Sequence, residues 1–226
     1  MRLRSAVEQE IRELIQRNGP ITFAQFMEAC LYSPQGGFYY SRANMISSHF
    51  RTSPTSHPVY GALIARQLEQ MWHILGDPSR FHVIEVGSGD GALARSIVQT
   101  CQQRATGFSD ALYYVASDYS PSIPQSTTDL MGWDDKSVGF QGPGGQDKSL
   151  NIQRVRSEGL RSFQNIFGCV LCNELVDNFP VHRFAIQDGR VREVFVTLKG
   201  DRLAEVLDEP STPRMEERLA GLGVTR

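Results

Sequence analysis

The 226-residue chain contains only four cysteines, no long apolar run and no cluster of like charges. No stretch approaches the roughly 20 apolar residues of a membrane-spanning helix, and the first residues lead into a helical pattern without a signal-peptide core. The formal net charge is −2, and lysine and arginine are scattered singly. Such a sequence offers no electrostatic footprint for nucleic acid or an anionic membrane, so we expect neither partner and a cytosol-like compartment.

The cysteines and histidines give no sign of a metal site. Cys169 and Cys172 have the spacing of a redox motif, but they lie in an apolar, strand-like run, where residues three apart point to opposite faces. We interpret them as small buried apolar residues. The five histidines have no metal-ligand spacing with one another or with the cysteines, so we predict no metal.

Residues 81–91, with the sequence FHVIEVGSGDG, are the most informative segment of the chain. A short apolar strand runs through an acidic residue into a loop with glycine at alternate positions. Glycine lets the chain turn sharply and lets backbone N–H groups approach a ligand, and a helix from Ala92 adds the positive end of its dipole. The segment predicts a crevice for a nucleotide-like ligand.

Two cofactor families use such a loop, and the position of the carboxylate helps to separate them. A dinucleotide fingerprint is matched only loosely, with alanine in its last position. The tighter pattern E-x-G-x-G-x-G looks like the first motif of class I S-adenosylmethionine-dependent methyltransferases. The methionine end of that cofactor carries an ammonium and a sulfonium, so a carboxylate favours it over a pyrophosphate. The predicted contacts from this segment are Glu85, Gly87, Ser88, Gly89 and Gly91.

A second strand, residues 112–117, ends at Asp118 and is followed by Tyr119. An acidic residue at this point of a βαβ unit can accept hydrogen bonds from both ribose hydroxyls. NAD sites use the same device, so Asp118 does not choose between the two cofactors. A plain turn residue before Ser-Pro is the structural alternative. We predict that Asp118 and Tyr119 contact the cofactor.

The rest of the pattern predicts an α/β protein with a Rossmann-like parallel sheet. The fourth strand is apolar throughout, as in a strand covered on both faces, and three alternating runs after it read as two antiparallel hairpins. We expect an N-terminal helical and loop region over residues 1–78, a cofactor-binding core over 79–180, a β-meander over 181–210 and the start of a further helix over 211–226. Strands are expected at 81–86, 112–117, 151–155 and 166–172, and poor order between 122 and 148.

The chain resembles the MidA family. The most specific segment is NELVDNFPVHRF at residues 173–184, and shorter matches are GPITF at 19–23, GGFYY at 36–40 and TSP at 52–54. Mitochondrial members of that family assist respiratory complex I assembly as protein arginine methyltransferases. The resemblance implies S-adenosylmethionine as cofactor, an arginine-containing partner protein, and a cytoplasmic location in a bacterium or the mitochondrial matrix in a eukaryote. It also implies a C-terminal truncation, because the family continues past residue 226 with further strands of a seven-stranded class I methyltransferase sheet.

Two carboxylates just past the fourth strand are candidates for binding a substrate guanidinium. The fourth strand should pair with the first at the topological switch point, which brings Glu174 and Asp177 to the mouth of the crevice. Asn173 is predicted to hold the acceptor or the ligand through its amide. Capping of the following helix is the structural alternative for Asn173 and Asp177. The long loop over residues 32–60 is expected to supply further cofactor contacts from Thr52, Ser53 and Pro54.

Two other functions remain open at this point. An NAD-dependent oxidoreductase would use the looser glycine pattern, and a non-enzymatic assembly or interaction module would retain a vestigial cofactor pocket. Binding of one cofactor without the other separates the two enzymes, and methyl transfer separates an enzyme from a module. A homodimer is a further expected assembly. If the later strands are absent, the outer edge of the fourth strand should be covered by the meander or a second chain.

Overall fold

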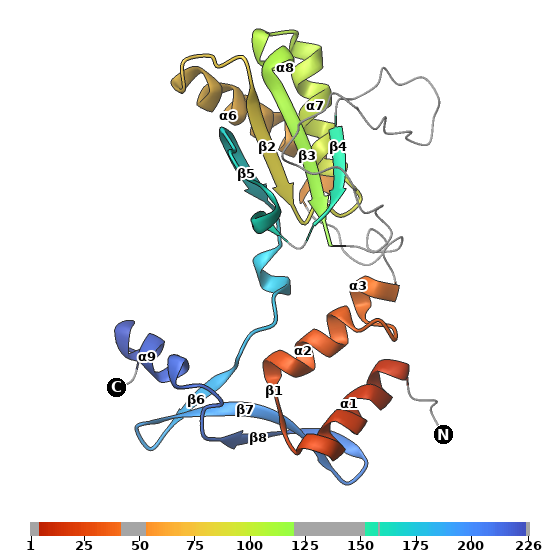
Figure 1. The fold of residues 1–226 in the computed structure, drawn as a ribbon, viewed down its shortest axis with the longest axis vertical. Helices are drawn as coiled ribbons and strands as arrows, with labels where there is room; N and C mark the ends of the chain where they lie inside the picture. The colour runs from red at the N-terminus through yellow and green to blue at the C-terminus, as the bar shows by residue number, and fades with distance from the viewer. Residues whose placement is uncertain (1–4, 42–52, 120–151, 158, 225–226) are drawn as a thin grey trace. The chain divides into compact units, whose positions relative to one another are not determined.

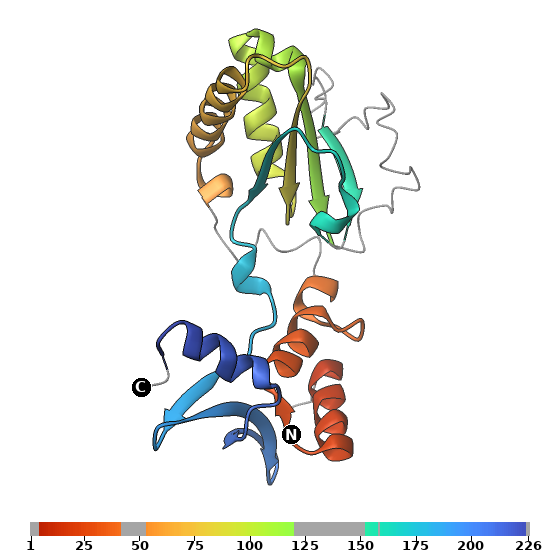
Figure 2. The same cartoon turned by 60° about the vertical axis from the view of Figure 1, so that its left-hand side comes forward.

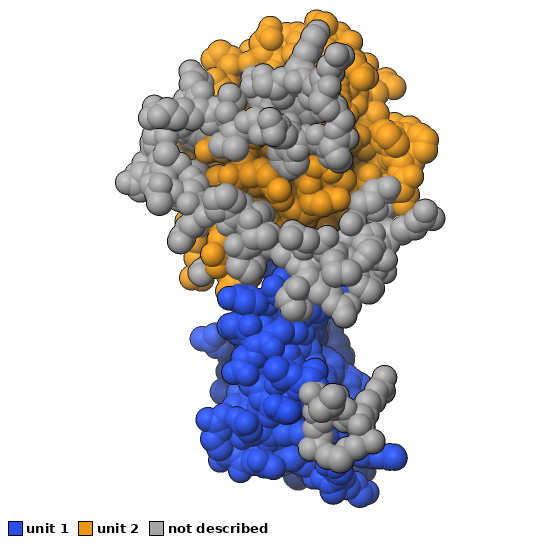
Figure 3. All heavy atoms as spheres, turned by 90° about the vertical axis from the view of Figure 1, so that its right-hand side faces the viewer, with its two compact units in different colours: residues 1–41, 176–226 blue, residues 42–175 orange. Residues whose placement is uncertain are grey.

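A computed structural model describes residues 5–41, 53–119, 152–157 and 159–224. The chain divides into two compact units, one formed by residues 1–41 and 176–226 and the other by residues 42–175 (Figure 3). These boundaries differ from the segments expected at residues 78 and 180, because the N-terminal helices join the meander in one unit. None of the helices in the described parts of the chain combines the length and apolarity that a bilayer crossing requires.

The unit of residues 42–175 is built on a four-stranded parallel sheet with the strand order β4-β3-β2-β5. As predicted, the first strand of the core pairs with the fourth, in register from His82–Gly168 to Val86–Cys172. The strands are β2 (Phe81–Val86), β3 (Leu112–Asp118), β4 (Ile152–Arg156) and β5 (Gly168–Cys172), and the helical segments are α5 (Ser53–Ser56), α6 (Val59–Ile74), α7 (Ala92–Arg104), α8 (Gly107–Ala111) and η1 (Leu160–Ser162).

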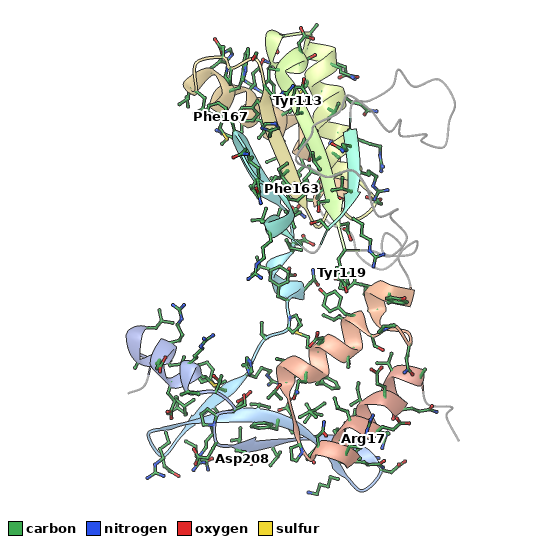
Figure 4. All side chains as sticks on the ribbon, in the orientation of Figure 1. Arg17, Tyr113, Tyr119, Phe163, Phe167 and Asp208 are labelled. Atoms are coloured by element: carbon green, nitrogen blue, oxygen red, sulfur yellow. The ribbon has the colours of Figure 1, made fainter. Side chains whose placement is uncertain are left out.

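Helices α6, α7 and α8 cover one face of this sheet (Figures 1 and 2). Alternate residues of the strands point to that face, and they form the largest core with the apolar sides of the helices. Phe81, Val83 and Tyr114 of the strands and Trp72 and Phe108 of the helices are all buried in it. On the other face, Phe163 (Figure 4) packs with three fully buried or nearly buried strand residues, Ile84, Val115 and Val155.

Strand β5 differs from its prediction. Val170 is 46 % exposed and Phe167, just before the strand, is 49 % exposed, so the apolar run is not covered on both faces. The reason is the strand order, which places β5 at the end of the sheet, and among the described residues no strand pairs with its outer edge. The meander does not pair with this edge, because its strands pair with one another and with β1 (Ile21–Thr22). Covering of the edge by a second chain stays a prediction.

Gly168 makes the pairing of β5 with β2 sterically possible. Its φ is 150°, and an added Cβ would lie 2.1 Å from the carbonyl oxygen of His82. We therefore expect Gly168→Ala to destabilise the protein by about 2 to 3 kcal/mol, measured by urea unfolding, because backbone atoms must separate. Gly200→Ala is the matched control, since φ is also positive there but a Cβ would meet nothing within 4 Å. Equal effects of the two substitutions would contradict this account of Gly168.

The other unit is an antiparallel sheet with helices packed on it. The long strand β7 pairs with β1, β6 and β8, and the two predicted hairpins are confirmed. The short strand β1 lies between the first two helices, where no strand was expected. The elements are α1 (Ala6–Asn18), α2 (Phe23–Tyr32), α3 (Phe38–Ser41), η2 (Val176–Asn178), β6 (Phe184–Gln187), β7 (Arg190–Lys199), β8 (Arg202–Asp208) and α9 (Pro213–Gly221).

Local sequence signals explain how α1, α2 and β1 join this sheet. Ser5 caps α1, and Thr22 forms a capping box with Gln25 at the start of α2. The apolar stripe of α1, including Ile11 and Ile15, packs with Ile21 of β1 and with strand β7. This shared core ties residues from both ends of the chain into one unit.

Candidate cofactor-binding site

The glycine loop, residues 87–91, connects the carboxyl end of β2 to α7 and is held against β3. The N–H groups of Gly87 and Ser88 both donate to the carbonyl oxygen of Ser117, at 2.9 and 3.0 Å. Gly87 has a φ of 75°, and an added Cβ would lie 2.8 Å from the Leu175 side chain. The loop thus needs glycine at residue 87 for its backbone conformation and for close contact with the segment after β5. Gly91 forms the N-cap of α7.

Asp118, the last residue of β3, fastens the tip of this loop. Its Oδ2 accepts a hydrogen bond from the N–H of Gly89 at 2.7 Å. Gly89 has a φ of 54°, and no described atom lies within 4 Å of the point where a Cβ would sit. The next residue, Tyr119, is 47 % exposed (Figure 4). Sequence reasoning placed Asp118 beside the loop, and the structure brings the two together.

Glu85 lies below the loop, on the face of the sheet that the helices cover. It is 3 % exposed, and its Oε2 accepts a hydrogen bond from the Tyr114 hydroxyl at 2.8 Å. The pKa of Glu85 is raised to about 7, mainly by burial. The hydrogen bond from Tyr114 acts to lower this pKa, and the nearby carboxylates of Asp118 and Asp90 act to raise it. Glu85 is therefore a carboxylate that would gain from a cationic ligand, because such a ligand would compensate the cost of ionising it in a buried position.

Two residues of this site escaped sequence reasoning. Tyr114 was seen only as part of an apolar strand, although its hydroxyl is the hydrogen-bond partner of Glu85. Arg154 lies in β4 and donates a hydrogen bond to the carbonyl oxygen of Gly89 at 2.6 Å. The alternation of residues along the third predicted strand could have placed Arg154 on a defined face, but the neighbouring strands and register were needed to place it at the loop.

The polar groups of this loop fit the S-adenosylmethionine that the sequence predicts. The Ser88 hydroxyl is buried and has no hydrogen-bond partner in the part of the chain that the structure describes. An unpartnered buried hydroxyl costs about 1 to 3 kcal/mol, which a ligand group can recover. The carboxylates of Glu85 and Asp118 suit a cationic amino acid end and a ribose, respectively. Among the described residues, no group of histidine, cysteine and acidic side chains could hold a metal ion.

The segment after β5 brings two of the predicted catalytic residues next to the glycine loop. The Asn173 Oδ1 accepts a hydrogen bond from the Tyr60 hydroxyl of α6 at 2.9 Å. Glu174 is exposed and has a φ of 49°, a left-handed conformation that costs a residue with a side chain roughly 1 to 2 kcal/mol. Leu175 then contacts Gly87. Glu174 is thus held in an unfavourable backbone conformation beside the loop, which is common at functional sites.

The remaining predicted residues lie elsewhere or outside the described chain. Asp177 lies in η2, in the other unit, where the neighbouring Asn178 accepts hydrogen bonds from Tyr32 and Tyr39 at 2.8 and 2.6 Å. Ser53 and Pro54 lie in the short helix α5, with Ser53 exposed. Thr52 lies outside the described residues, as does the segment over 122–148 that was expected to be poorly ordered. The roles of these residues remain predictions.

Comparison with known proteins identifies the family. A family model described as "Putative S-adenosyl-L-methionine-dependent methyltransferase" matches residues 63–226. The chain belongs to this family. The resemblance found in the sequence is confirmed, and this methyltransferase family has the cofactor that the glycine loop predicted.

Curated relatives match nearly the whole chain. It is 26 % identical over 220 residues to "Protein arginine methyltransferase NDUFAF7 homolog, mitochondrial" of Drosophila melanogaster, covering 92 % of this chain and 50 % of that protein. It is 27 % identical over 213 residues to the NDUFAF7 protein arginine methyltransferase of Rattus norvegicus, covering 88 % of this chain and 48 % of that protein. The chain therefore spans about half the length of the curated relatives it matches.

Solved structures confirm the fold of this chain. A crystal structure of a protein from Burkholderia thailandensis, bound to S-adenosyl-homocysteine, superposes with a TM-score of 0.68 at 24 % identity. The superposition covers 96 % of this chain and 53 % of the Burkholderia thailandensis chain. A native crystal structure of a protein from the same organism gives a TM-score of 0.67, also at 24 % identity, over 96 % of this chain and 51 % of that one. The predicted α/β methyltransferase fold is thus confirmed.

Proposed function

We propose that this protein transfers a methyl group from S-adenosylmethionine to an arginine side chain of a partner protein. The observation that carries the proposal is the placement of Glu85 and Asp118 at the glycine loop, where no described atom lies within 4 Å of the point that a Cβ of Gly89 would occupy. Relatives named as protein arginine methyltransferases support the choice of arginine. The mitochondrial location in their names supports a mitochondrial compartment if this chain comes from a eukaryote.

The residues of the chain would divide the work between binding and transfer. Glu85 would face the cationic amino acid end of the cofactor, Asp118 would accept the ribose hydroxyls, and the loop amides would approach without side chains in the way. When bound, the cofactor supplies an electrophilic methyl group on a sulfonium. Transfer forms a nitrogen–carbon bond as the sulfur–carbon bond breaks, and alignment of the two reactants supplies most of the rate enhancement.

Glu174 would hold the substrate guanidinium and accept the proton that the methylated nitrogen loses. A guanidinium is protonated in water, so a carboxylate that orients it and stabilises its charge is needed at the acceptor side. Glu174 is exposed, next to the glycine loop, and carried on a fixed backbone conformation. Asn173 would orient this segment through its hydrogen bond with Tyr60.

Calorimetry and methyl transfer test this proposal in sequence. We expect S-adenosylmethionine to bind the chain and NAD not to bind. Labelled transfer into arginine-containing proteins of a cognate lysate, using the full-length protein, should fall about 100-fold or more in Glu174→Gln, with cofactor affinity unchanged within about twofold. Glu216→Gln, at an exposed glutamate of α9, is the matched control and should keep full activity.

The other outcomes assign the two alternative functions. Binding of NAD without S-adenosylmethionine would make the chain an oxidoreductase and overturn the proposal. Cofactor binding without label incorporation by the full-length protein would favour an assembly module. Equal activity of Glu174→Gln and the control would remove Glu174 from the mechanism.

A further inference from the structure

The tip of the glycine loop is held from β4 as well as from β3. Arg154 is the middle residue of β4 and is in register with Ala116 of β3, which in turn pairs with Glu85 of β2. Neighbours in register on parallel strands point to the same face, so these three side chains form one row across the sheet. Ala116, between the two charged residues in this row, is small and fully buried.

Arg154 and Asp118 bind the two backbone polar groups of the same loop residue. The Nη2 of Arg154 donates to the carbonyl oxygen of Gly89 at 2.6 Å, and the N–H of Gly89 donates to Asp118 Oδ2 at 2.7 Å. Both are charge-assisted hydrogen bonds, which are the stronger class. Gly89 lacks a side chain that could fix its conformation, so these two contacts, here called the Gly89 clamp, define the loop tip.

The guanidinium of Arg154 also balances a group of carboxylates. Asp118, Asp90 and Glu85 all interact with it electrostatically, and so does the cationic Arg95 of α7. The described charged and titratable groups that shift the pKa of Glu85 are Tyr114 and Asp118 of β3, Asp90 of the loop and Arg154 of β4. Tyr114 and Arg154 lower this pKa, and the two aspartates raise it. Removing Arg154 would leave the carboxylates facing one another without that compensation.

We propose that Arg154 is a positioning residue of the cofactor site, which fixes the loop tip through the Gly89 carbonyl and offsets the charge of Glu85, Asp90 and Asp118. The cradle is thereby formed before the ligand arrives, so that binding does not have to order the loop. The inference rests on the proposed function for the identity of the ligand. The Gly89 clamp itself is a property of the free protein and can be measured without any ligand.

Three variants test this role in the free protein by NMR. Arg154→Met removes both the charge and the hydrogen bond, Arg154→Lys keeps the charge but lacks the planar fork, and Arg161→Met is the control at an exposed arginine of η1. In Arg154→Met we expect the Gly89 amide to exchange about tenfold faster and the Glu85 carboxyl to titrate at higher pH. In Arg154→Lys only the exchange should change, and the control should match the wild type.

Calorimetry with S-adenosylmethionine between pH 6 and 8 gives the second readout. Arg154→Met should bind the cofactor about tenfold more weakly than the wild type at pH 7. Because the cationic ligand favours ionised Glu85, affinity should rise with pH in both proteins, and in Arg154→Met this rise should occur at higher pH than in the wild type. Arg154→Lys should bind more weakly with the wild-type pH profile. A general folding defect would lower affinity in both variants without separating their pH profiles.

The outcomes separate this inference from the proposed function. If the wild type binds no S-adenosylmethionine but the two free-protein signals change as expected, the cofactor proposal fails and the clamp stands. If Gly89 exchange and Glu85 titration in Arg154→Met equal those of the wild type, the positioning role is overturned, whatever the wild type binds.

Discussion

Glu85→Gln is expected to stabilise the free protein at neutral pH and to weaken cofactor binding at the same time. The pKa of Glu85 is about 7 in the folded chain because of burial, against 4.5 as its ordinary value. The folded state therefore holds a proton that the unfolded state has lost between these two pH values. The contribution of Glu85 to the free energy of unfolding is therefore greatest below pH 4.5. It falls by about 1.4 kcal/mol per pH unit as the pH rises to 7, or by about 3 kcal/mol in total.

Urea unfolding at pH 4 and pH 8 measures this effect. Glutamine can still accept the Tyr114 hydrogen bond but does not ionise, so the variant should match the wild type at pH 4 and exceed it by about 3 kcal/mol at pH 8. Its affinity for S-adenosylmethionine at pH 8 should fall by a factor of about 10 to 100, because the negative charge is lost. A wild-type stability that does not change between pH 4.5 and 7, measured against Glu216→Gln, would contradict a protonated Glu85.

The opposite signs of these two expected effects are what a buried carboxylate that binds a cation would produce. A buried charge that destabilises the free protein is tolerated where a ligand compensates it. Glu174 resembles Glu85 in this respect. Its left-handed backbone conformation lowers stability, and it carries a carboxylate beside the loop. Both residues act against stability at the carboxyl ends of β2 and β5, where the crevice of a parallel sheet lies.

The sequence predicted the parts of the fold that depend on local patterns. The glycine loop and the strands β2 and β3 follow from residues close together in the chain. The pairing of β2 with β5 followed from a general topological rule. The candidate site residues Glu85 and Asp118 were predicted because each lies at or near the end of a strand, next to a glycine or turn signal.

What the sequence did not predict depends on contacts between distant residues. The exposure of β5 follows from its position at the end of the sheet, which an apolar run cannot reveal. Arg154 is 65 residues from Gly89 in the chain, and only the register of three strands brings them together. The joining of residues 1–41 with 176–226 likewise required the pairing of β1 with β7, which spans most of the sequence.

Glu193→Ala is expected to cause the largest loss of stability in the unit that contains the meander. Glu193 lies in β7 and is fully buried, and its two carboxylate oxygens lie 2.6 Å from His182 Nδ1 and from the N–H of Ser211. It therefore joins β7 to the segment before β6 and to the segment before α9. Removing one partner of a buried charged network typically costs about 3 to 5 kcal/mol, because the other groups keep no acceptor and a cavity remains.

The pH dependence of this network has the opposite sign to that of Glu85. Burial acts to raise the pKa of Glu193, but the hydrogen bonds from His182 and Ser211 outweigh it and lower the pKa below its ordinary value of 4.5. The stabilisation is thus present above pH 4.5 and is lost as the pH falls through the lowered pKa. Glu193→Ala should accordingly differ most from the wild type near pH 7 and least in acid.

Urea unfolding near pH 7, followed by a probe in this unit, checks the prediction against a matched surface variant. Glu205→Ala removes a carboxylate of the neighbouring strand β8 that pairs with Arg183 at the surface, and it should cost less than about 1 kcal/mol. A similar cost for both substitutions would show that the Glu193 network contributes no more than a surface ion pair. A large cost for Glu193→Ala alone would establish that this one buried carboxylate holds the meander to its flanking segments.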